Sequence, residues 1–515
     1  MKTQDTLVIL DFGSQYTQLI TRCVRDQSVF SQQLPWNTDP KLITSLEPKG
    51  IILSGGPASV NLPDSPKLPA FLLNLKIPIL GICYGMQLFA EALDGQVIPS
   101  MEREYGSTAL LVPQANPLIP EGEHSVLMSH GDRIKKLPTG FQILASTDNT
   151  PIAAMGDPDR YYYGVQFHPE VKHTPIGVKI IRNFLFDICR IKPDWTPELI
   201  IKKCVNQIRN QVGSERVLSA VSGGVDSSVA TALVHRAIGD QLDAVFVDTG
   251  LLRKDEPAGV IHTFKGTLGV QFHSVSAGNV FYSDLKGITD PEQKRSRIGA
   301  RFIRIFEDQA KAFGQPNYLV QGTIYPDVVE SCSPDRAQTE TIKTHHNVGG
   351  LPSEMDFELV EPLRYLFKDE VRKIGSALKL PDSLVWRQPF PGPGLAIRCL
   401  GEVTPERIEI LRAADFIYLN ELDQAGLGGK STGISQYFAV LLPVKTVGVM
   451  GDQRTYENVI ALRAVSTDDF MTADWSRLPL DLLAKISNRI VNEVQGVNRV
   501  VYDITSKPPG TIEWE

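Results

Sequence analysis

The sequence predicts an α/β protein with two doubly wound, mostly parallel sheets, followed by a smaller α+β unit. Short apolar runs alternate with helical patterns in two long stretches, as in parallel sheets that helices cover on both faces. The segment 387–394 is so dense in Pro and Gly that it cannot be a helix or a central strand. Beyond it, long helical patterns and strands mix, which is typical of an α+β arrangement.

The first stretch carries the elements of one parallel sheet and an antiparallel part. We expect strands at Thr6–Leu10, Gly50–Ser54 and Ile77–Leu80, a helix at Met86–Ala92, antiparallel structure across Ser107–Val165 and a closing helix at Ile180–Cys189. The Pro-flanked segment Pro193–Pro197 indicates a linker.

The second stretch repeats the alternation, and the last part of the chain does not. We expect helices at Glu198–Val212, Val229–Ala237, Pro405–Leu422 and Leu480–Val494, and strands at Val217–Val221, Asp243–Val247, Tyr318–Gln321, Phe438–Val444, Ile460–Val465 and Arg499–Ile504. The predicted domains are therefore residues 1–192, 193–390 and 391–515.

Composition narrows the class of protein. A chain of 515 residues is too long for one core, and 42% apolar with 22% charged residues is ordinary for a globular protein. The net charge of -7, without a basic tail, argues against nucleic-acid binding. Six cysteines without CxxC pairs fit a reducing cytoplasm. No apolar run is long enough for a membrane span, and the polar residues before Leu7 lead us to expect no signal peptide.

A glycine-flanked cysteine follows the third predicted strand, in Gly-Ile-Cys-Tyr-Gly (Gly81–Gly85, here termed the elbow). Such a turn between strand and helix lifts one side chain clear of the sheet, as in the nucleophile elbow of serine hydrolases. We expect the Cys83 thiol to be exposed beside the positive end of a helix, and both factors favour the reactive thiolate. The simpler interpretation of Cys83 alone is a small buried apolar residue.

A base for this nucleophile lies in Gln-Phe-His-Pro-Glu, residues 166–170. His168 can accept the thiol proton, and Glu170 can hold the imidazole in the required tautomer, which is the Cys-His-acid logic of acyl transfer. Together, the elbow and this later segment resemble the class I, triad-type glutamine amidotransferases.

A second chemical site is predicted where the strand Val217–Val221 runs into Ser-Gly-Gly-Val-Asp-Ser-Ser (Ser222–Ser228, here termed the phosphate loop). Small residues let backbone N–H groups close around a phosphate, and the following helix N-terminus adds a favourable dipole. The loop lacks the Gly-Lys-Ser/Thr ending of a Walker A motif. It is similar to the pyrophosphate loop of the N-type ATP pyrophosphatases, which activate a carbonyl oxygen as an adenylate.

Two carboxylates are candidates for holding Mg²⁺ at this loop, since magnesium prefers one or two carboxylates plus phosphate oxygens. Asp226 lies in the loop itself, where its simpler role is that of a helix N-cap. Asp327 follows the predicted strand Tyr318–Gln321, and for it the two roles are evenly matched.

Two further polar segments attract attention. Residues 338–350 resemble a mobile lid that brings Lys343 onto ATP phosphates. The adjacent His345 and His346 would point to opposite faces of a strand and have no partners at zinc spacing, so we expect no structural zinc. Gly428–Thr432 lacks the first glycine of a Walker loop, since Gln424 stands there, and is predicted to be a surface loop.

The combination of an amidotransferase elbow and the phosphate loop in one chain resembles the glutamine-hydrolysing GMP synthetase family. Three later motifs agree, namely residues 390–395, 448–452 and 507–515. The resemblance spans essentially the whole chain. It implies that XMP, ATP, glutamine and water give GMP, AMP, pyrophosphate and glutamate, with Mg²⁺ as cofactor, and that the C-terminal unit forms a homodimer.

The resemblance also assigns roles to individual residues. Cys83 is the nucleophile, His168 the base and Glu170 its orienting carboxylate, with the backbone N–H groups of Gly56 and Tyr84 as the oxyanion hole. The remaining assignments are Ser222, Gly223, Gly224, Val225, Asp226, Ser227, Ser228 and Asp248 for ATP, and Arg295, Lys507 and Glu513 for XMP. Arg297 is an open alternative to Arg295. From sequence alone, Arg295 and Lys507 read as solvated surface charges.

Other classes fit less well. A glutamine-dependent NAD synthetase carries a nitrilase-type amidase with a Glu-Lys-Cys set, which we do not find. Argininosuccinate synthetases and tRNA-thiolating enzymes share the phosphate loop but need no Cys83 elbow. A non-catalytic regulatory protein would not be expected to keep both motifs intact.

Overall fold

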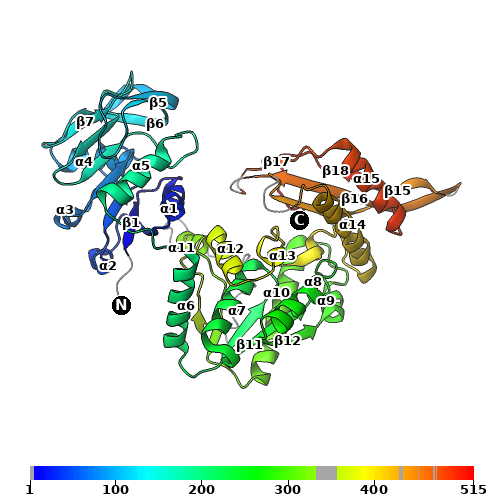
Figure 1. The fold of residues 1–515 in the computed structure, drawn as a ribbon. Helices are drawn as coiled ribbons and strands as arrows, with labels where there is room; N and C mark the ends of the chain where they lie inside the picture. Colours follow the sequence, from blue (N-terminus) through cyan, green and yellow to red (C-terminus); the bar gives the residue numbers. More distant parts are fainter. Residues whose placement is uncertain (1–4, 332–356, 429–432, 451, 468–469, 471) are drawn as a thin grey trace. The chain divides into compact units, whose positions relative to one another are not determined.

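The computed structural model describes residues 5–331, 357–428, 433–450, 452–467, 470 and 472–515 (Figure 1). It divides into two compact units, Met1–Leu199 and Ile200–Glu515. The predicted boundaries at residues 192 and 390 stay predictions.

The first unit is built on a seven-stranded sheet. Its elements are β1 (Thr6–Asp11), α1 (Thr17–Asp26), β2 (Phe30–Pro35), α2 (Pro40–Ser45), β3 (Gly50–Leu53), α3 (Phe71–Asn74), β4 (Ile79–Ile82), α4 (Tyr84–Ala92), β5 (Gln96–Val112), β6 (Gly122–Lys136), β7 (Gln142–Ala145), β8 (Ala154–Asp157), β9 (Tyr162–Val165), α5 (Gly177–Asn183) and the π-helix η1 (Phe184–Ile188). The strand order is β2-β1-β3-β4-β9-β8-β7, parallel from β2 to β9 and antiparallel beyond. Strands β5 and β6 form a separate antiparallel ribbon.

Alternate residues of the central strands belong to two different cores. Leu7 and Ile9 of β1 pack in one cluster with residues of α1 and α5. Val8 and Leu10 pack in another cluster with residues of α2, α3 and α4. Since successive strand side chains point to opposite faces, helices cover both faces of this sheet, as a doubly wound fold requires.

The second unit contains a five-stranded parallel sheet in the order β12-β11-β10-β13-β14 and a separate C-terminal sheet. Its elements begin with α6 (Pro197–Val212), β10 (Val217–Val221), α7 (Val225–Ile238), the 3-10 helix η2 (Gly239–Gln241), β11 (Leu242–Asp248), α8 (Glu256–Ile261), the π-helix η3 (His262–Thr267), β12 (Gln271–Ser276), α9 (Gly278–Leu285), α10 (Pro291–Ala312), β13 (Tyr318–Val320), α11 (Tyr325–Ser331), β14 (Glu358–Val360), α12 (Lys368–Ala377) and α13 (Asp382–Val385).

The C-terminal part combines two long helices with a mixed sheet. After the 3-10 helix η6 (Gly394–Ile397) come α14 (Pro405–Gln424), β15 (Gln436–Met450), β16 (Gln453–Ser466), β17 (Asp474–Trp475), α15 (Leu480–Glu493) and β18 (Val497–Tyr502). Strands β15, β16 and β17 are antiparallel, and β18 joins β16 in parallel. The predicted α/β class with a following α+β part is confirmed.

Several predicted bounds were wrong by a few residues. Strand β4 continues to Ile82, because Gly81 still pairs with Leu53 of β3. Helix α4 starts at Tyr84, not Met86, and α7 starts at Val225, not Val229. In both cases the chain turns into the helix directly after the turn residue, so residues taken for a loop form the first helical turn. The strands β15 and β16 extend well beyond the predicted 438–444 and 460–465.

Candidate active sites

The elbow is a tight backbone turn that depends on its two glycines. Cys83 has a φ of 51°, in the left-handed region that non-glycine residues rarely adopt, and its N–H donates to the carbonyl oxygen of Val165 at 2.7 Å. A Cβ on Gly81 would lie 2.5 Å from the carbonyl oxygen of Gly85, and one on Gly85 would lie 2.5 Å from that of Leu53. The backbone therefore approaches itself too closely here for any other residue type, and Cys83 is held at the start of α4.

The predicted triad is assembled. His168 is hydrogen-bonded to Cys83, and its Nδ1 lies 2.8 Å from Oε1 of Glu170. Burial alone lowers the pKa of His168, but the hydrogen bonds and charges of Cys83 and Glu170 outweigh it and raise that pKa to about 10. The ring of Tyr16 meets the imidazole edge-on at 5.4 Å. The surroundings of His168 therefore favour the imidazolium, the form that the ring takes when it accepts the Cys83 proton.

The expected exposure of Cys83 was wrong, because only 6% of this residue is accessible. Two groups cover its sulfur. The carbonyl oxygen of Ser129, on β6, lies 3.7 Å from Sγ, and Nε2 of Gln166 lies 3.5 Å from it. The Cys83 sulfur is therefore buried beside the His168 imidazole, whereas the general elbow pattern predicts a sulfur clear of the sheet.

The predicted oxyanion-hole residues are neighbours. Gly56 follows β3, and a Cβ built on it would meet the Tyr84 ring carbon Cδ1 at 3.4 Å and the Phe12 carbonyl oxygen at 2.7 Å. Tyr84 is the first residue of α4, so its N–H has no acceptor within the helix. Tyr84 directly follows Cys83 in the chain, and a Cβ built on Gly55, the residue before Gly56, would lie 3.7 Å from the Cβ of Cys83.

Sequence reasoning missed three residues around the nucleophile: Gln87, Ser129 and Gln166. Gln87 lies four positions after Cys83 on α4, and its Nε2 donates to Gln166 Oε1 at 3.3 Å. The i, i+4 spacing from Cys83 was a readable signal for Gln87, whereas Gln166 lies just beyond β9, where strand spacing gives no such signal. No sequence pattern near Ser129 predicts that its carbonyl oxygen contacts the Cys83 sulfur.

The phosphate loop lies between β10 and α7. Gly223 has a φ of +77°, and a Cβ there would meet Val260 Cγ2 at 3.1 Å, so the turn requires glycine. Oγ of Ser222 lies 3.0 Å from Oγ of Ser227 and accepts a hydrogen bond from the Gly224 N–H at 3.3 Å. The N-cap of α7 is Gly224, so the simpler interpretation of Asp226 as an N-cap was wrong.

Asp226 is suited to bind a cation. Its Oδ2 accepts from Nζ of Lys368 at 3.2 Å, while its Oδ1 is buried and has no hydrogen-bond partner within the described residues. A buried carboxylate oxygen without a donor is costly unless a ligand meets it. This oxygen and the hydroxyl-rich loop fit the donor set that Mg²⁺ takes together with phosphate. No group of three or more potential metal-ligating side chains occurs in the described parts of the chain.

The other predicted residues of this site differ in how they are placed. Oδ2 of Asp327 accepts from the Ile324 N–H at 3.1 Å, so it caps the start of α11. Asp248 ends β11, and its Oδ1 accepts from the Gly250 N–H at 2.9 Å. Lys343, His345 and His346 lie outside the described residues, as does most of the Gly428–Thr432 loop. Sequence reasoning missed Lys368, which contacts Asp226, and it missed Arg387. NH1 of Arg387 donates to the Gly223 carbonyl oxygen at 3.0 Å.

All three predicted XMP residues involve the C-terminal segment of the chain. NH2 of Arg295 donates to the backbone oxygen of Glu515 at 2.7 Å, whereas Arg297 is exposed. The Glu513 carboxylate accepts hydrogen bonds from Nε and NH2 of the fully buried Arg398, at 3.0 and 2.7 Å. Nζ of Lys507 donates to the Phe470 carbonyl oxygen at 2.7 Å. Arg295 and Lys507 are therefore both engaged, not free surface charges.

Comparison with known proteins agrees with this geometry. Residues 8–188 match the family model "Glutamine amidotransferase class-I", and residues 420–514 match "GMP synthase C terminal domain". The fold and the Cys-His-Glu site of the first unit thus define a class I glutamine amidotransferase joined to a further α/β unit.

Full-length relatives specify the family. The chain is 57% identical to "GMP synthase [glutamine-hydrolyzing]" of Thermomicrobium roseum, covering 99% of this chain and 97% of that protein. It is 55% identical to the protein of the same name from Heliobacterium modesticaldum, covering 100% of both. The chain belongs to the glutamine-hydrolysing GMP synthase family.

None of the helices in the described part of the chain combines the length and the apolar character that crossing a bilayer requires.

Proposed function

We propose that this chain makes GMP from XMP, with glutamine as nitrogen donor and ATP as co-substrate. XMP, ATP, glutamine and water give GMP, AMP, pyrophosphate and glutamate. The observation that carries the proposal is the assembled Cys83–His168–Glu170 triad in the same chain as the phosphate loop, in a sequence whose full-length relatives bear the corresponding name.

In the first unit, His168 takes the proton of the Cys83 thiol, and the resulting thiolate attacks the side-chain carbonyl carbon of glutamine. The imidazolium then gives this proton to the departing amide nitrogen as the carbon–nitrogen bond breaks, so that ammonia leaves and the acyl group stays on the sulfur as a thioester. The Glu170 carboxylate binds Nδ1 of the His168 ring, which leaves Nε2 of the same ring available for this proton transfer. The N–H groups of Gly56 and Tyr84 meet the oxyanion, an interaction worth about 3 kcal/mol in comparable sites. Water then hydrolyses the thioester to glutamate.

In the second unit, the phosphate loop holds ATP while an oxygen of XMP attacks the α-phosphate and releases pyrophosphate. The backbone of Ser222–Ser228 and the start of α7 offer N–H donors to the phosphates, and Asp248 would contact the adenosine half. Asp226, with Asp327 as a second carboxylate, would hold Mg²⁺, which supplies charge neutralisation on the phosphates when bound. Lys343 would contact ATP phosphates.

Ammonia then attacks the adenylated carbon of XMP and displaces AMP. Arg295 would bind the XMP phosphate, and Lys507 and Glu513 would contact XMP as well. Producing ammonia in the same chain keeps it unprotonated and raises its effective concentration at the second site. The functional segments in this proposal are residues 1–192 for glutamine hydrolysis, 193–390 for adenylation and 391–515 for XMP binding and dimerisation.

The proposed assembly is a cytoplasmic homodimer. Its support is the ribbon of β15 and β16, where Val447, Val449 and Tyr456 are about half exposed or more. Apolar side chains gathered on an exposed ribbon are typical of an association surface. Sedimentation at micromolar concentration measures this directly, and a purely monomeric chain would contradict it.

Product analysis tests the proposed function. The purified chain is incubated with XMP, ATP, Mg²⁺ and glutamine, and nucleotides are separated by chromatography. We expect GMP, AMP and pyrophosphate in equal amounts, with one glutamate for each GMP. Glutamate without GMP would remove XMP as the substrate, and AMP without glutamate would remove glutamine as the donor.

A further inference from the structure

One strand of the first unit contacts the triad and its neighbour Gln87 through backbone carbonyl groups. On β6, the Leu127 oxygen accepts the His168 N–H at 3.1 Å, and the Ser129 oxygen lies 3.7 Å from the Cys83 sulfur. A little further along, the Asp132 oxygen accepts Nε2 of Gln87 at 3.1 Å. The geometry of the elbow therefore depends on where β6 lies.

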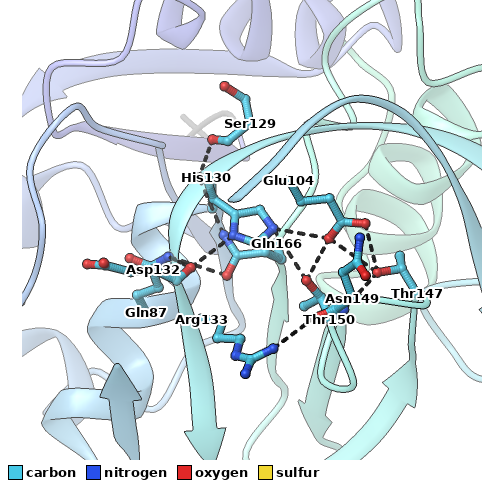
Figure 2. Close-up of polar contacts among 11 residues, drawn as sticks. Gln87, Glu104, Ser129, His130, Asp132, Arg133, Thr147, Asn149, Thr150 and Gln166 are labelled. Carbon is cyan, nitrogen blue, oxygen red and sulfur yellow. Dashed lines mark hydrogen bonds and ion pairs between the residues drawn. The ribbon is translucent and has the colours of Figure 1, made fainter. Parts of the chain in front are cut away.

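The ladder that should fix β6 is interrupted at this place. Its pairing with β5 shifts register between the pairs Glu104–His130 and Pro99–Asp132. Regular backbone hydrogen bonds between β5 and β6 are thus interrupted at residues 130–132, and the side chain of His130 contacts the backbone there instead. Nδ1 of His130 lies 2.9 Å from the Asp132 carbonyl oxygen (Figure 2). Because a carbonyl can only accept, Nδ1 carries the proton in either charge state of the ring.

The other nitrogen of His130 faces a buried carboxylate. Nε2 lies 3.5 Å from Oε2 of Glu104, and both residues are only 5% exposed. The hydroxyl of Thr150 donates to the same Oε2 at 2.6 Å, and that of Thr147 donates to Oε1 at 3.0 Å (Figure 2). The two threonine hydroxyls therefore hold the Glu104 carboxylate in place beside Nε2, while the Nδ1 bond to Asp132 holds the other side of the buried imidazole.

A buried carboxylate contributes little net stability, because the cost of its desolvation offsets most of its electrostatic attraction to neighbouring groups. Its bonds instead run in series toward the nucleophile. Glu104 orients His130, His130 holds the Asp132 carbonyl, and that carbonyl holds Gln87, which bonds Gln166 beside the Cys83 sulfur. Neither Glu104 nor His130 contacts the sulfur in this series.

We propose that Glu104 and His130 are positioning residues for glutamine hydrolysis: this second buried His–Glu pair fixes the Ser129–Asp132 segment and thereby the placement of the Cys83 thiol. The inference rests on the proposed glutaminase reaction. It predicts that loss of the Nδ1 donor lowers turnover, because a displacement of about 1 Å in a reacting group can cost on the order of 10²-fold in rate.

The test compares two substitutions of similar size. In His130→Asn, the side-chain amide nitrogen replaces Nδ1 as the donor to Asp132; in His130→Leu no donor remains. We expect His130→Leu to lower kcat for glutamine hydrolysis on the order of 10²-fold with little change in KM, and His130→Asn to recover most of it. Equal loss in both variants, or none in His130→Leu, would overturn the proposal.

Matched controls separate positioning from folding. Ser125→Ala removes one hydroxyl of the exposed pair that Ser125 of β6 forms with Ser107 of β5, and it should leave kcat unchanged. Thermal unfolding is followed for every variant. If His130→Leu does not fold, Thr150→Val decides, since it removes only the hydroxyl bound to Glu104: a lower kcat supports the proposal and an unchanged kcat overturns it.

Two readouts keep this inference distinct from the proposed function. Rates of GMP formation from added ammonium should be equal in all variants, because that reaction does not use Cys83. A wild-type chain without glutaminase activity would overturn both proposals together. An active wild-type chain with fully active His130→Leu would overturn only the role of the Glu104–His130 pair.

Discussion

The elbow and the phosphate loop share a backbone path but differ in whether their buried polar atoms have partners. Each follows a buried strand of a parallel sheet, turns through a residue with positive φ, and enters a helix directly. In the elbow that residue is Cys83, whose sulfur has partners on several sides. In the phosphate loop it is Gly223, and the buried Oδ1 of Asp226 and Oγ of Ser228 have no partner within the described residues.

This difference separates two kinds of site. In the elbow, the proposed reaction takes its reacting atom and its proton from the protein, and within the triad only Oε2 of Glu170 is buried without a partner among the described residues. In the phosphate loop, the protein supplies donors and a carboxylate that only a ligand would complete. The first site should therefore depend on individual side chains, and the second on backbone shape and on what binds there.

The largest effect should come from the nucleophile. Cys83→Ala should lower glutamine-driven GMP synthesis by about 10⁴-fold or more, as loss of a triad nucleophile does, while ammonium-driven synthesis is kept. Initial rates with each nitrogen source measure this. Cys189→Ala, which removes a buried thiol outside the site, is the control. Loss of both activities in Cys83→Ala would mean that the two sites are not separate.

The next effect concerns the carboxylate of the phosphate loop. Asp226→Asn should slow pyrophosphate release by about 10³-fold with either nitrogen source, since metal-assisted charge neutralisation contributes several kcal/mol. Pyrophosphate release is followed with a coupled assay, and Asp240→Asn, at an exposed carboxylate of the same unit, serves as control. Normal release at saturating Mg²⁺ would exclude Asp226 as a metal ligand.

A smaller effect should follow from backbone shape. Gly223→Ala forces a side chain into a left-handed conformation and against Val260, at a cost of about 1–3 kcal/mol. Gly213→Ala is the matched control, because its φ is also positive but nothing lies within 4 Å of the added Cβ. We expect both variants to lose stability and only Gly223→Ala to raise the KM for ATP. An equal KM in both would show that the loop tolerates a side chain.

The smallest effect is a pH dependence in the elbow. The pKa of His168 is raised above its usual 6.5 to about 10, so its contribution to stability is complete below about pH 6.5 and is lost as the pH rises through 10. Glu170→Gln removes one of the groups that raise this pKa. The difference in unfolding temperature between wild type and Glu170→Gln should therefore be largest near pH 6 and shrink toward pH 10. A difference that grows with pH would contradict the raised pKa.

Sequence predicted the parts of both sites that are local. The glycines around Cys83, the His168–Glu170 spacing and the loop after β10 are each readable within a few residues, because strand and helix periods determine which side chains share a face. The layered α/β architecture followed from the same alternation of apolar runs.

What sequence did not predict depends on distant pairing. The burial of Cys83 comes from Ser129 on β6, and Lys368 reaches Asp226 across more than a hundred residues. The Glu104–His130 pair arises where the β5–β6 register shifts, and a shift of this kind leaves no local pattern. The pairing of the Glu513 carboxylate with the buried Arg398 joins residues 115 positions apart in the same way.

The most direct test of the two-site account follows the nitrogen atom. The chain is supplied with XMP, ATP, Mg²⁺ and glutamine labelled with ¹⁵N in its side-chain amide, and the GMP formed is examined by mass spectrometry. The account predicts that wild-type GMP carries the label, and that Cys83→Ala gives GMP only when unlabelled ammonium is added. Labelled GMP from Cys83→Ala would contradict it.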